Sequence, residues 1–162
     1  MGEEPAVRIL FVCSGNICRS AMAAEYARHR VAASGLRHAV VDSAGTLGIE
    51  GERAFPEAIE VLREHGLHLG NHRSRGLREQ DFKTADLVIV MTLAHLDEID
   101  NRFPLGAAPR RLLRAFEKGV EPRDGAEDLE DPIGKPLEAY RECFEIIKTC
   151  VDHLVLHLKH EP

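Results

Sequence analysis

The chain alternates between short apolar runs and longer segments in which apolar residues recur every three or four positions. Val7–Val12 is a short run rich in β-branched and apolar residues, which predicts a buried strand. Leu87–Met91 is apolar without alternation, which is typical of a central strand in a parallel sheet covered on both faces. A second strand is predicted from Ala39 to Gly45, and Arg111–Leu113 is a weak candidate for a fourth.

Helical spacing of apolar residues predicts four helices, several of them bounded by proline or glycine. One begins at Arg19 and ends before Ser34-Gly35, one is marked by Phe55, Ile59 and Leu62, one runs from about Ala94 to Asn101, and one extends from Leu137 to Leu158. Strands that alternate with helices favour an α/β fold on a parallel sheet. At 162 residues the chain has room for a single domain, residues 1–162, without a visible linker.

The charge and the hydropathy of the chain exclude some classes of function. The net charge is −6 and no stripe is dense in Lys or Arg, so we expect no nucleic-acid partner. No apolar run approaches the roughly 20 residues of a membrane helix, and the short acidic start does not read as a secretory signal. We therefore expect a cytoplasmic location and no membrane partner. Nothing in the pattern indicates an oligomeric state.

The four cysteines are too few and too unevenly spaced for a disulfide scaffold. Cys143 and Cys150 lie seven residues apart on the last predicted helix, too far for a disulfide, and are predicted to be packing residues. We expect no metal ion, because Cys13 and Cys18 have no second Cys/His cluster at a suitable spacing. We also expect no cofactor.

The segment between the first strand and the first helix carries the strongest functional signal, Cys13-Ser14-Gly15-Asn16-Ile17-Cys18-Arg19-Ser20. Open α/β sheets place ligands at such a junction, and a helix N-terminus suits a phosphate dianion. Gly15 and Asn16 tolerate left-handed backbone angles, and Arg19 can bind two phosphate oxygens. The same positive field favours the thiolate of Cys13, which is placed to attack phosphorus, while Ser20 can donate its hydroxyl to the sulfur.

Such a mechanism needs a group that protonates the departing oxygen and then activates water. We predict Asp131, because Pro132 biases the preceding residue away from helix and leaves Asp131 on an extended loop. Asp128 and Glu130 are the competitors nearby. They belong to the longest irregular stretch, from Glu117 to Asp131, and loops of that length are often functional.

Together with Asp42-Ser43-Ala44-Gly45, His72-Arg73-Ser74-Arg75 and Asp131-Pro132-Ile133-Gly134, this loop makes the chain similar to the bacterial low-molecular-weight protein-tyrosine phosphatases over most of its length. The resemblance implies a flavodoxin-like three-layer sandwich with a central four-stranded parallel sheet in the order 2-1-3-4. It implies that Cys13 is the nucleophile, Arg19 the phosphate clamp and Asp131 the acid and base. The implied phosphate-binding residues are Ser14, Gly15, Asn16, Ile17, Cys18 and Ser20.

The resemblance also assigns supporting roles. Asn16, Ser43 and His72 resemble the polar network that holds the loop in shape. The Cys18 thiol stands where family members form a reversible disulfide with the nucleophile, which protects it from overoxidation.

The substrate is less directly indicated. Animal-type members carry an aromatic pair after the Asp-Pro, where this chain has Ile133 and Gly134, and Leu47-Gly48-Ile49 supplies no aromatic residue opposite. The arginine phosphatases of the family carry Thr at the position of Ile17. Because Ile17 has no hydroxyl, we favour a phosphotyrosine protein as substrate, with phosphoarginine as the alternative.

Two further functions are weaker alternatives. A thiol-dependent arsenate reductase needs additional cysteines on a mobile segment near the loop, and none stands between Cys18 and Cys143. A non-catalytic phosphate-binding module would not need Cys13, Arg19 and Asp131 together.

Overall fold

A computed structural model describes residues 6–160, apart from 37, 105–107, 120, 124 and 126. Its sheet consists of β1 (Val7–Cys13), β2 (Ala39–Gly45), β3 (Leu87–Val90) and β4 (Arg110–Leu112). All neighbouring strands are parallel, and their order is β2-β1-β3-β4. The predicted four-stranded parallel sheet and its order are therefore confirmed.

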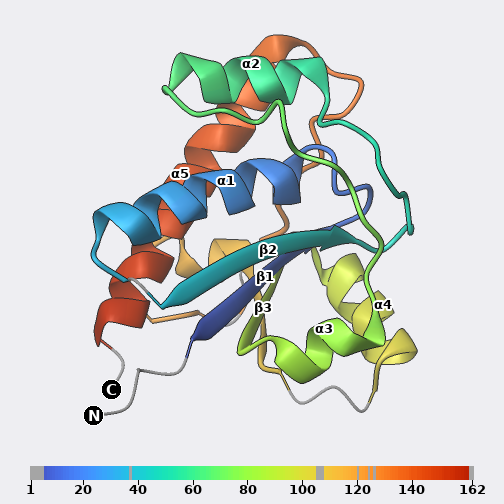
Figure 1. Ribbon diagram of the computed structural model, residues 1–162, viewed down its shortest axis with the longest axis vertical. Helices are drawn as coiled ribbons and strands as arrows, with labels where there is room; N and C mark the ends of the chain where they lie inside the picture. Colours follow the sequence, from blue (N-terminus) through green and yellow to red (C-terminus); the bar gives the residue numbers. More distant parts are fainter. Residues whose placement is uncertain are drawn as a thin grey trace.

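Helices cover both faces of this sheet (Figure 1). They are α1 (Arg19–Ala33), α2 (Pro56–Glu64), α3 (Glu79–Thr84), α4 (Leu93–Arg102), α5 (Leu137–His160) and a short 3-10 helix, η1 (Leu113–Phe116). Helices α1 and α5 lie on one face, and α3 and α4 lie on the other.

Three short elements differ from the sequence prediction: α3, β4 and η1. Helix α3 was missed because six residues with one buried apolar side chain, Phe82, show no helical period. The fourth strand spans Arg110–Leu112, one residue earlier than predicted at both ends, and Leu113 begins η1, which was not predicted.

The strands divide the apolar residues between two cores. Phe11 of β1 faces the larger core beneath α1 and α5, whereas Leu10 and Val12 face the smaller core beneath α3 and α4. Such alternation explains why a strand covered on both faces is apolar throughout. Cys143 and Cys150 are buried in the larger core, which confirms that they are packing residues.

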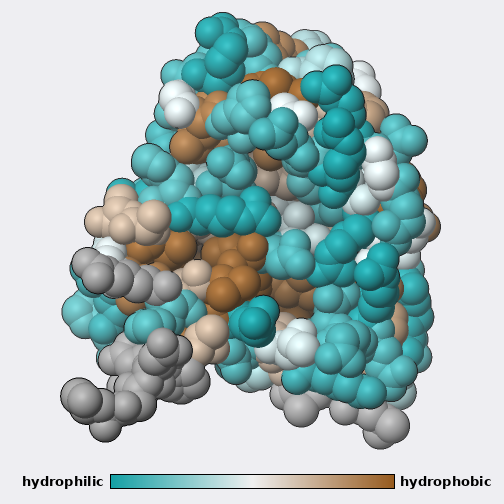
Figure 2. All heavy atoms as spheres, in the orientation of Figure 1, coloured by the Kyte–Doolittle hydropathy of each residue, from teal (hydrophilic) through white to brown (hydrophobic). Residues whose placement is uncertain are grey.

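The face in view in Figure 2 is mostly polar, with apolar side chains gathered over the edge strand β2, where Val40 is exposed. None of the helices that the structure describes is long and apolar enough to span a bilayer. The first five residues, to which the expectation about a secretory signal refers, lie outside the described residues.

Candidate active site

The loop after β1 is held by one buried asparagine. Asn16 has a φ of 59°, the only positive value at a non-glycine position among the described residues, and it is fully buried. Its Nδ2 donates to Ser20 Oγ at 2.8 Å, and its Oδ1 accepts from the backbone N of Arg75 at 3.1 Å. His72 Nε2 donates to the Asn16 carbonyl at 2.6 Å. These contacts fix a backbone conformation that side-chain-bearing residues rarely adopt.

The Cys13 thiol lies at the carboxyl end of the central strand and makes hydrogen bonds with two groups of the loop. Its Sγ is 2.9 Å from Ser20 Oγ, and the Asn16 backbone N donates to it at 3.3 Å. Because Asn16 Nδ2 already donates to Ser20 Oγ, the hydroxyl proton of Ser20 is free to point at the sulfur. Helix α1 starts here without a side-chain cap, so its positive end faces the loop.

Arg19 and Asp131 are brought together, as predicted. The Arg19 guanidinium is 4% exposed, donates to the Leu129 carbonyl at 2.8 Å and lies 3.4 Å from Asp131 Oδ2. Asp131 is 38% exposed, and its other oxygen accepts from the Ile133 N at 3.1 Å. The Asp131 carboxylate therefore lies between the buried Arg19 guanidinium and the solvent.

The two neighbouring carboxylates are committed elsewhere. Asp128 Oδ1 accepts from the Leu93 N at 2.8 Å, and Glu130 pairs with Lys135. Neither is paired with Arg19. This geometry favours Asp131 over both competitors for a role at the loop.

Gly45 allows the end of β2 to touch the loop. A Cβ added there would stand 2.6 Å from the Ser14 carbonyl oxygen and 3.0 Å from the Asn16 N. The next two residues support the loop directly, because Thr46 N donates to Cys13 O at 2.9 Å and Leu47 N donates to Ser14 O at 3.0 Å. The Ser-Ala-Gly sequence thus ends in a residue that the loop requires.

Ser43 is close to the loop support without being hydrogen bonded to it. Its side chain is 3% exposed, yet its hydroxyl makes no hydrogen bond to any residue that the structure describes. The hydrogen-bonded support of Asn16 instead runs through His72, Ser20 and the Arg75 backbone.

His95 is a site residue that the sequence analysis missed. Its Nε2 lies 2.8 Å from Ser14 Oγ, and its backbone N donates to the Thr92 side chain that caps α4. Burial, assisted by the Arg19 charge, lowers its pKa to about 4, so the imidazole is neutral near pH 7. Its position just after β3, at the same sheet edge as Cys13, is the signal that could have identified it.

A cavity of about 450 Å³ opens beside Arg19, between the loop, the start of α4 and the Asp131 segment. Four carboxylates line it: Glu98, Asp128, Glu130 and Asp131. Cys18, by contrast, is buried, with its Sγ 3.8 Å from Tyr140 Oη, and burial raises its thiol pKa to about 12. Among the described residues, no group of three or more His, Cys, Asp or Glu side chains could hold a metal ion.

Two groups of the loop contact the Cys13 thiol at the junction of β1 and α1, and the buried guanidinium of Arg19 begins that helix. This combination is typical of cysteine-dependent phosphatases on a flavodoxin-like sheet. The profile of one family, Low molecular weight phosphotyrosine protein phosphatase, matches residues 8–162. The chain belongs to this family.

The chain is similar both to a protein named as an arginine phosphatase and to one named as a tyrosine phosphatase. A protein-arginine-phosphatase of Geobacillus stearothermophilus is 38% identical over 95% of this chain and 97% of its own. A low molecular weight protein-tyrosine-phosphatase of Streptomyces coelicolor is 37% identical over 95% and 94%.

Solved structures of an arginine phosphatase and of a tyrosine phosphatase are also similar to the chain. A mutant of the arginine phosphatase YwlE with a phosphorylated active-site serine has a TM-score of 0.88 at 29% identity, covering 96% of this chain and 97% of its own. The tyrosine phosphatase of T. tengcongensis has a TM-score of 0.84 at 36% identity, covering 93% and 99%.

Proposed function

We propose that the chain, as a single domain over residues 1–162, hydrolyses phosphotyrosine in protein substrates, and small aryl phosphates, through a cysteinyl-phosphate on Cys13. The observation that carries this proposal is the thiol of Cys13, which receives hydrogen bonds from Ser20 and Asn16 at the uncapped start of α1. Both donors stabilise a thiolate, which is the nucleophilic form of cysteine.

The phosphate is bound by the loop and by Arg19. Amides of the residues from Ser14 to Ser20 and the positive end of α1 balance the dianion, and the guanidinium binds two of its oxygens. Arg19 is already oriented by the Leu129 carbonyl and Asp131, so little side-chain freedom is lost on binding.

The reaction has two steps. In the first, Cys13 Sγ forms a bond to phosphorus as the bond to the leaving oxygen breaks, and Asp131 donates the proton that this oxygen takes. In the second, the Asp131 carboxylate accepts a proton from water, the water oxygen bonds to phosphorus, and the S–P bond breaks. The Ser20 hydroxyl stabilises the departing thiolate, and inorganic phosphate leaves.

The walls of the site favour an aryl substrate. Leu47 is 65% exposed beside the loop, and Ile133 is 45% exposed next to the Asp131 segment. Ile17 and Ile49 lie together over Gly15. These aliphatic side chains offer contact to a phenyl ring without the stacking that aromatic walls would add.

Phosphoarginine is the second candidate, and two observations favour it. A relative named protein-arginine-phosphatase covers nearly the whole chain, and four carboxylates line the cavity beside Arg19. A guanidinium leaving group carries positive charge, which carboxylates stabilise and aliphatic walls do not.

The two substrates are separated by kinetics on matched peptides carrying phosphotyrosine, phosphoarginine or phosphoserine. We expect the highest kcat/KM for phosphotyrosine, and we expect Ile17→Thr to shift the ratio towards phosphoarginine. A higher kcat/KM of the unaltered chain for phosphoarginine would reverse the assignment. We further propose that the enzyme works in the cytoplasm on phosphorylated proteins.

A further inference from the structure

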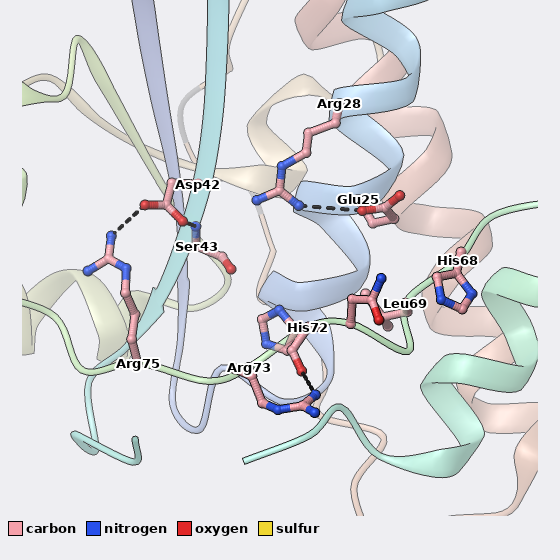
Figure 3. A pocket seen from close by; sticks show the side chains of 10 residues that line it. Glu25, Arg28, Asp42, Ser43, His68, Leu69, His72, Arg73 and Arg75 are labelled. Carbon is pink, nitrogen blue, oxygen red and sulfur yellow. Dashed lines mark hydrogen bonds and ion pairs between the residues drawn. The ribbon is translucent and has the colours of Figure 1, made fainter. Parts of the chain in front are cut away.

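A second polar cavity, of about 290 Å³, lies behind the phosphate-binding loop, between α1, the end of β2 and residues 68–75. It has no lining residue in common with the cavity beside Arg19. In Figure 3, Arg28, Ser43 and His72 lie along one side of this cavity, and Glu25 and His68 lie across from them. We call it the rear cavity.

The rear cavity contains hydrogen-bonding groups that nothing in the described chain uses. The Ser43 side chain is 97% buried, and its hydroxyl has no hydrogen-bond partner among the described residues. Arg28 donates Nε to the Val41 carbonyl at 3.1 Å and Nη1 to Glu25 Oε2 at 3.4 Å, whereas its Nη2 makes no hydrogen bond within the described chain. The Ser43 hydroxyl and the Arg28 Nη2 group line the same cavity, and both can donate to an oxyanion.

The charges around the rear cavity also favour an anion. Three arginines and two carboxylates line it, in a chain whose net charge is −6. Arg28 is paired with Glu25 and Arg75 with Asp42 and Asp81, so within the described chain the unpaired charge among the lining arginines is that of Arg73. Asp42 is directed away, because it accepts from Arg75 Nη2 at 2.9 Å and from the Ser43 N at 2.8 Å. Arg73 has no carboxylate partner among the described residues and donates to two backbone carbonyls.

His72 links the rear cavity to the loop. Its Nε2 must carry the proton, because its partner, the Asn16 carbonyl, can only accept. In the neutral ring Nδ1 therefore carries a lone pair and can only accept a hydrogen bond. It becomes a donor when the ring is protonated. Burial, together with the charges of Arg28 and Arg73, lowers the His72 pKa, and the hydrogen bond to the Asn16 carbonyl and the charge of Asp42 oppose this. Glu25 and His68 are the other titratable groups that line the cavity.

We propose that the rear cavity is a second anion site, which binds inorganic phosphate, the product of the reaction, between Arg28, Ser43 and His72. A bound dianion offsets the charges of the arginines, so His72 takes up a proton and donates Nδ1 to the ligand. The occupant then adjoins the residue that holds Asn16, whose backbone N contacts the nucleophile.

Calorimetric titration with inorganic phosphate, combined with inhibition kinetics, tests this site. We expect two phosphates per chain, of which only one competes with an aryl phosphate substrate. Arg28→Gln should weaken the second phosphate by tenfold or more, as removal of a charge-assisted hydrogen bond does, and leave the competitive inhibition constant unchanged. Arg30→Gln, on the same helix but paired with Asp152, is the matched control and should leave both phosphates bound.

A second variant and a measurement of proton uptake test the site independently of whether Arg28→Gln folds. Ser43→Ala removes an oxygen that bonds to nothing in the described chain, so it should fold, and it should weaken the second phosphate alone. Titration in two buffers of different ionisation enthalpy should show proton uptake that Arg28→Gln abolishes. A single phosphate per chain, or a second one that Arg28→Gln and Ser43→Ala leave equally tight, would overturn the proposal.

Discussion

Cys13 Sγ and Ser20 Oγ lie 2.9 Å apart inside the loop, and once Cys13 is a thiolate the Ser20 hydroxyl is the donor of this hydrogen bond. Asn16 Nδ2 donates to the same Ser20 oxygen at 2.8 Å, which leaves the hydroxyl proton for the sulfur. We therefore expect the serine to stabilise a negative charge on Cys13 both before attack and when the S–P bond breaks.

Ser20→Ala should slow turnover by about ten- to a hundredfold, because a hydrogen bond to a charged group contributes about 1.5–3 kcal/mol. The loss should fall on breakdown of the cysteinyl-phosphate, where the thiolate is the leaving group. Rapid-mixing kinetics should accordingly show a larger burst of released phenol in the variant. Ser34→Ala, at the far end of α1, is the control, and an unchanged rate in Ser20→Ala would contradict this role.

Asp131→Asn should lower kcat by roughly 10²–10⁴-fold for substrates with poor leaving groups, because the amide cannot protonate the departing oxygen. For p-nitrophenyl phosphate, whose leaving group needs little protonation, the loss in the first step should be much smaller. The slope of rate against leaving-group pKa measures this difference.

Asp128→Asn is the matched control for the acid, since its amide oxygen can still accept from the Leu93 N. If Asp128→Asn steepens the leaving-group dependence and Asp131→Asn does not, the proton comes from Asp128.

Gly45→Ala should displace the loop after β1, because residue 45 contacts this loop from the end of β2. The new methyl would stand 2.6 Å from the Ser14 carbonyl oxygen, a backbone atom that cannot rotate away. We expect a destabilisation of about 1–3 kcal/mol and a loss of kcat/KM for aryl phosphates. Denaturant unfolding and steady-state kinetics measure the two effects.

Gly70→Ala provides the comparison for Gly45→Ala, because the nearest atoms to its methyl would belong to the movable His68 ring. Equal effects of the two variants would show that the contact with the loop is not the cause.

Most of the central machinery could be predicted from sequence because it is local. Cys13, Asn16 and Arg19 lie within seven consecutive positions, and the strand and helix on either side have clear apolar periods. Asp131 is distant, but the proline that follows it marks its conformation.

The parts that could not be predicted depend on tertiary packing. The Leu129 carbonyl that orients Arg19 is a backbone atom, which no residue pattern encodes. His95 meets Ser14 only because β3 lies beside β1 in the sheet. The Arg75 amide reaches Asn16 through an irregular segment without periodicity.

Mild peroxide should inactivate the enzyme reversibly through a Cys13–Cys18 disulfide. Peroxide oxidises the Cys13 thiolate to a sulfenic acid with release of hydroxide, and the Cys18 thiolate then displaces hydroxide from that sulfur to form the disulfide. Burial raises the Cys18 pKa to about 12, so the second step should quicken as pH rises. Intact mass with and without reductant should show a loss of two hydrogens and its reversal.

Cys18→Ser separates protection from inactivation. This variant should lose activity to peroxide irreversibly, with sulfinic or sulfonic acid at Cys13, while Cys150→Ser should behave as the unaltered enzyme does because Cys150 lies in the core. Sulfonic acid as the only product in the unaltered chain would refute the protective disulfide.

His95 should make folding stability dependent on pH. Its pKa is near 4 in the folded chain and about 6.5 when unfolded, so between these values the unfolded state binds more protons and stability falls as pH falls. We expect His95 to account for a loss of about 2 kcal/mol between pH 7 and pH 5. In His95→Gln this part of the pH dependence should disappear, as measured by denaturant unfolding at both values. His29→Gln, an exposed position on α1, should retain it, and a parallel pH dependence in His95→Gln and the unaltered chain would show that His95 is not the titrating group.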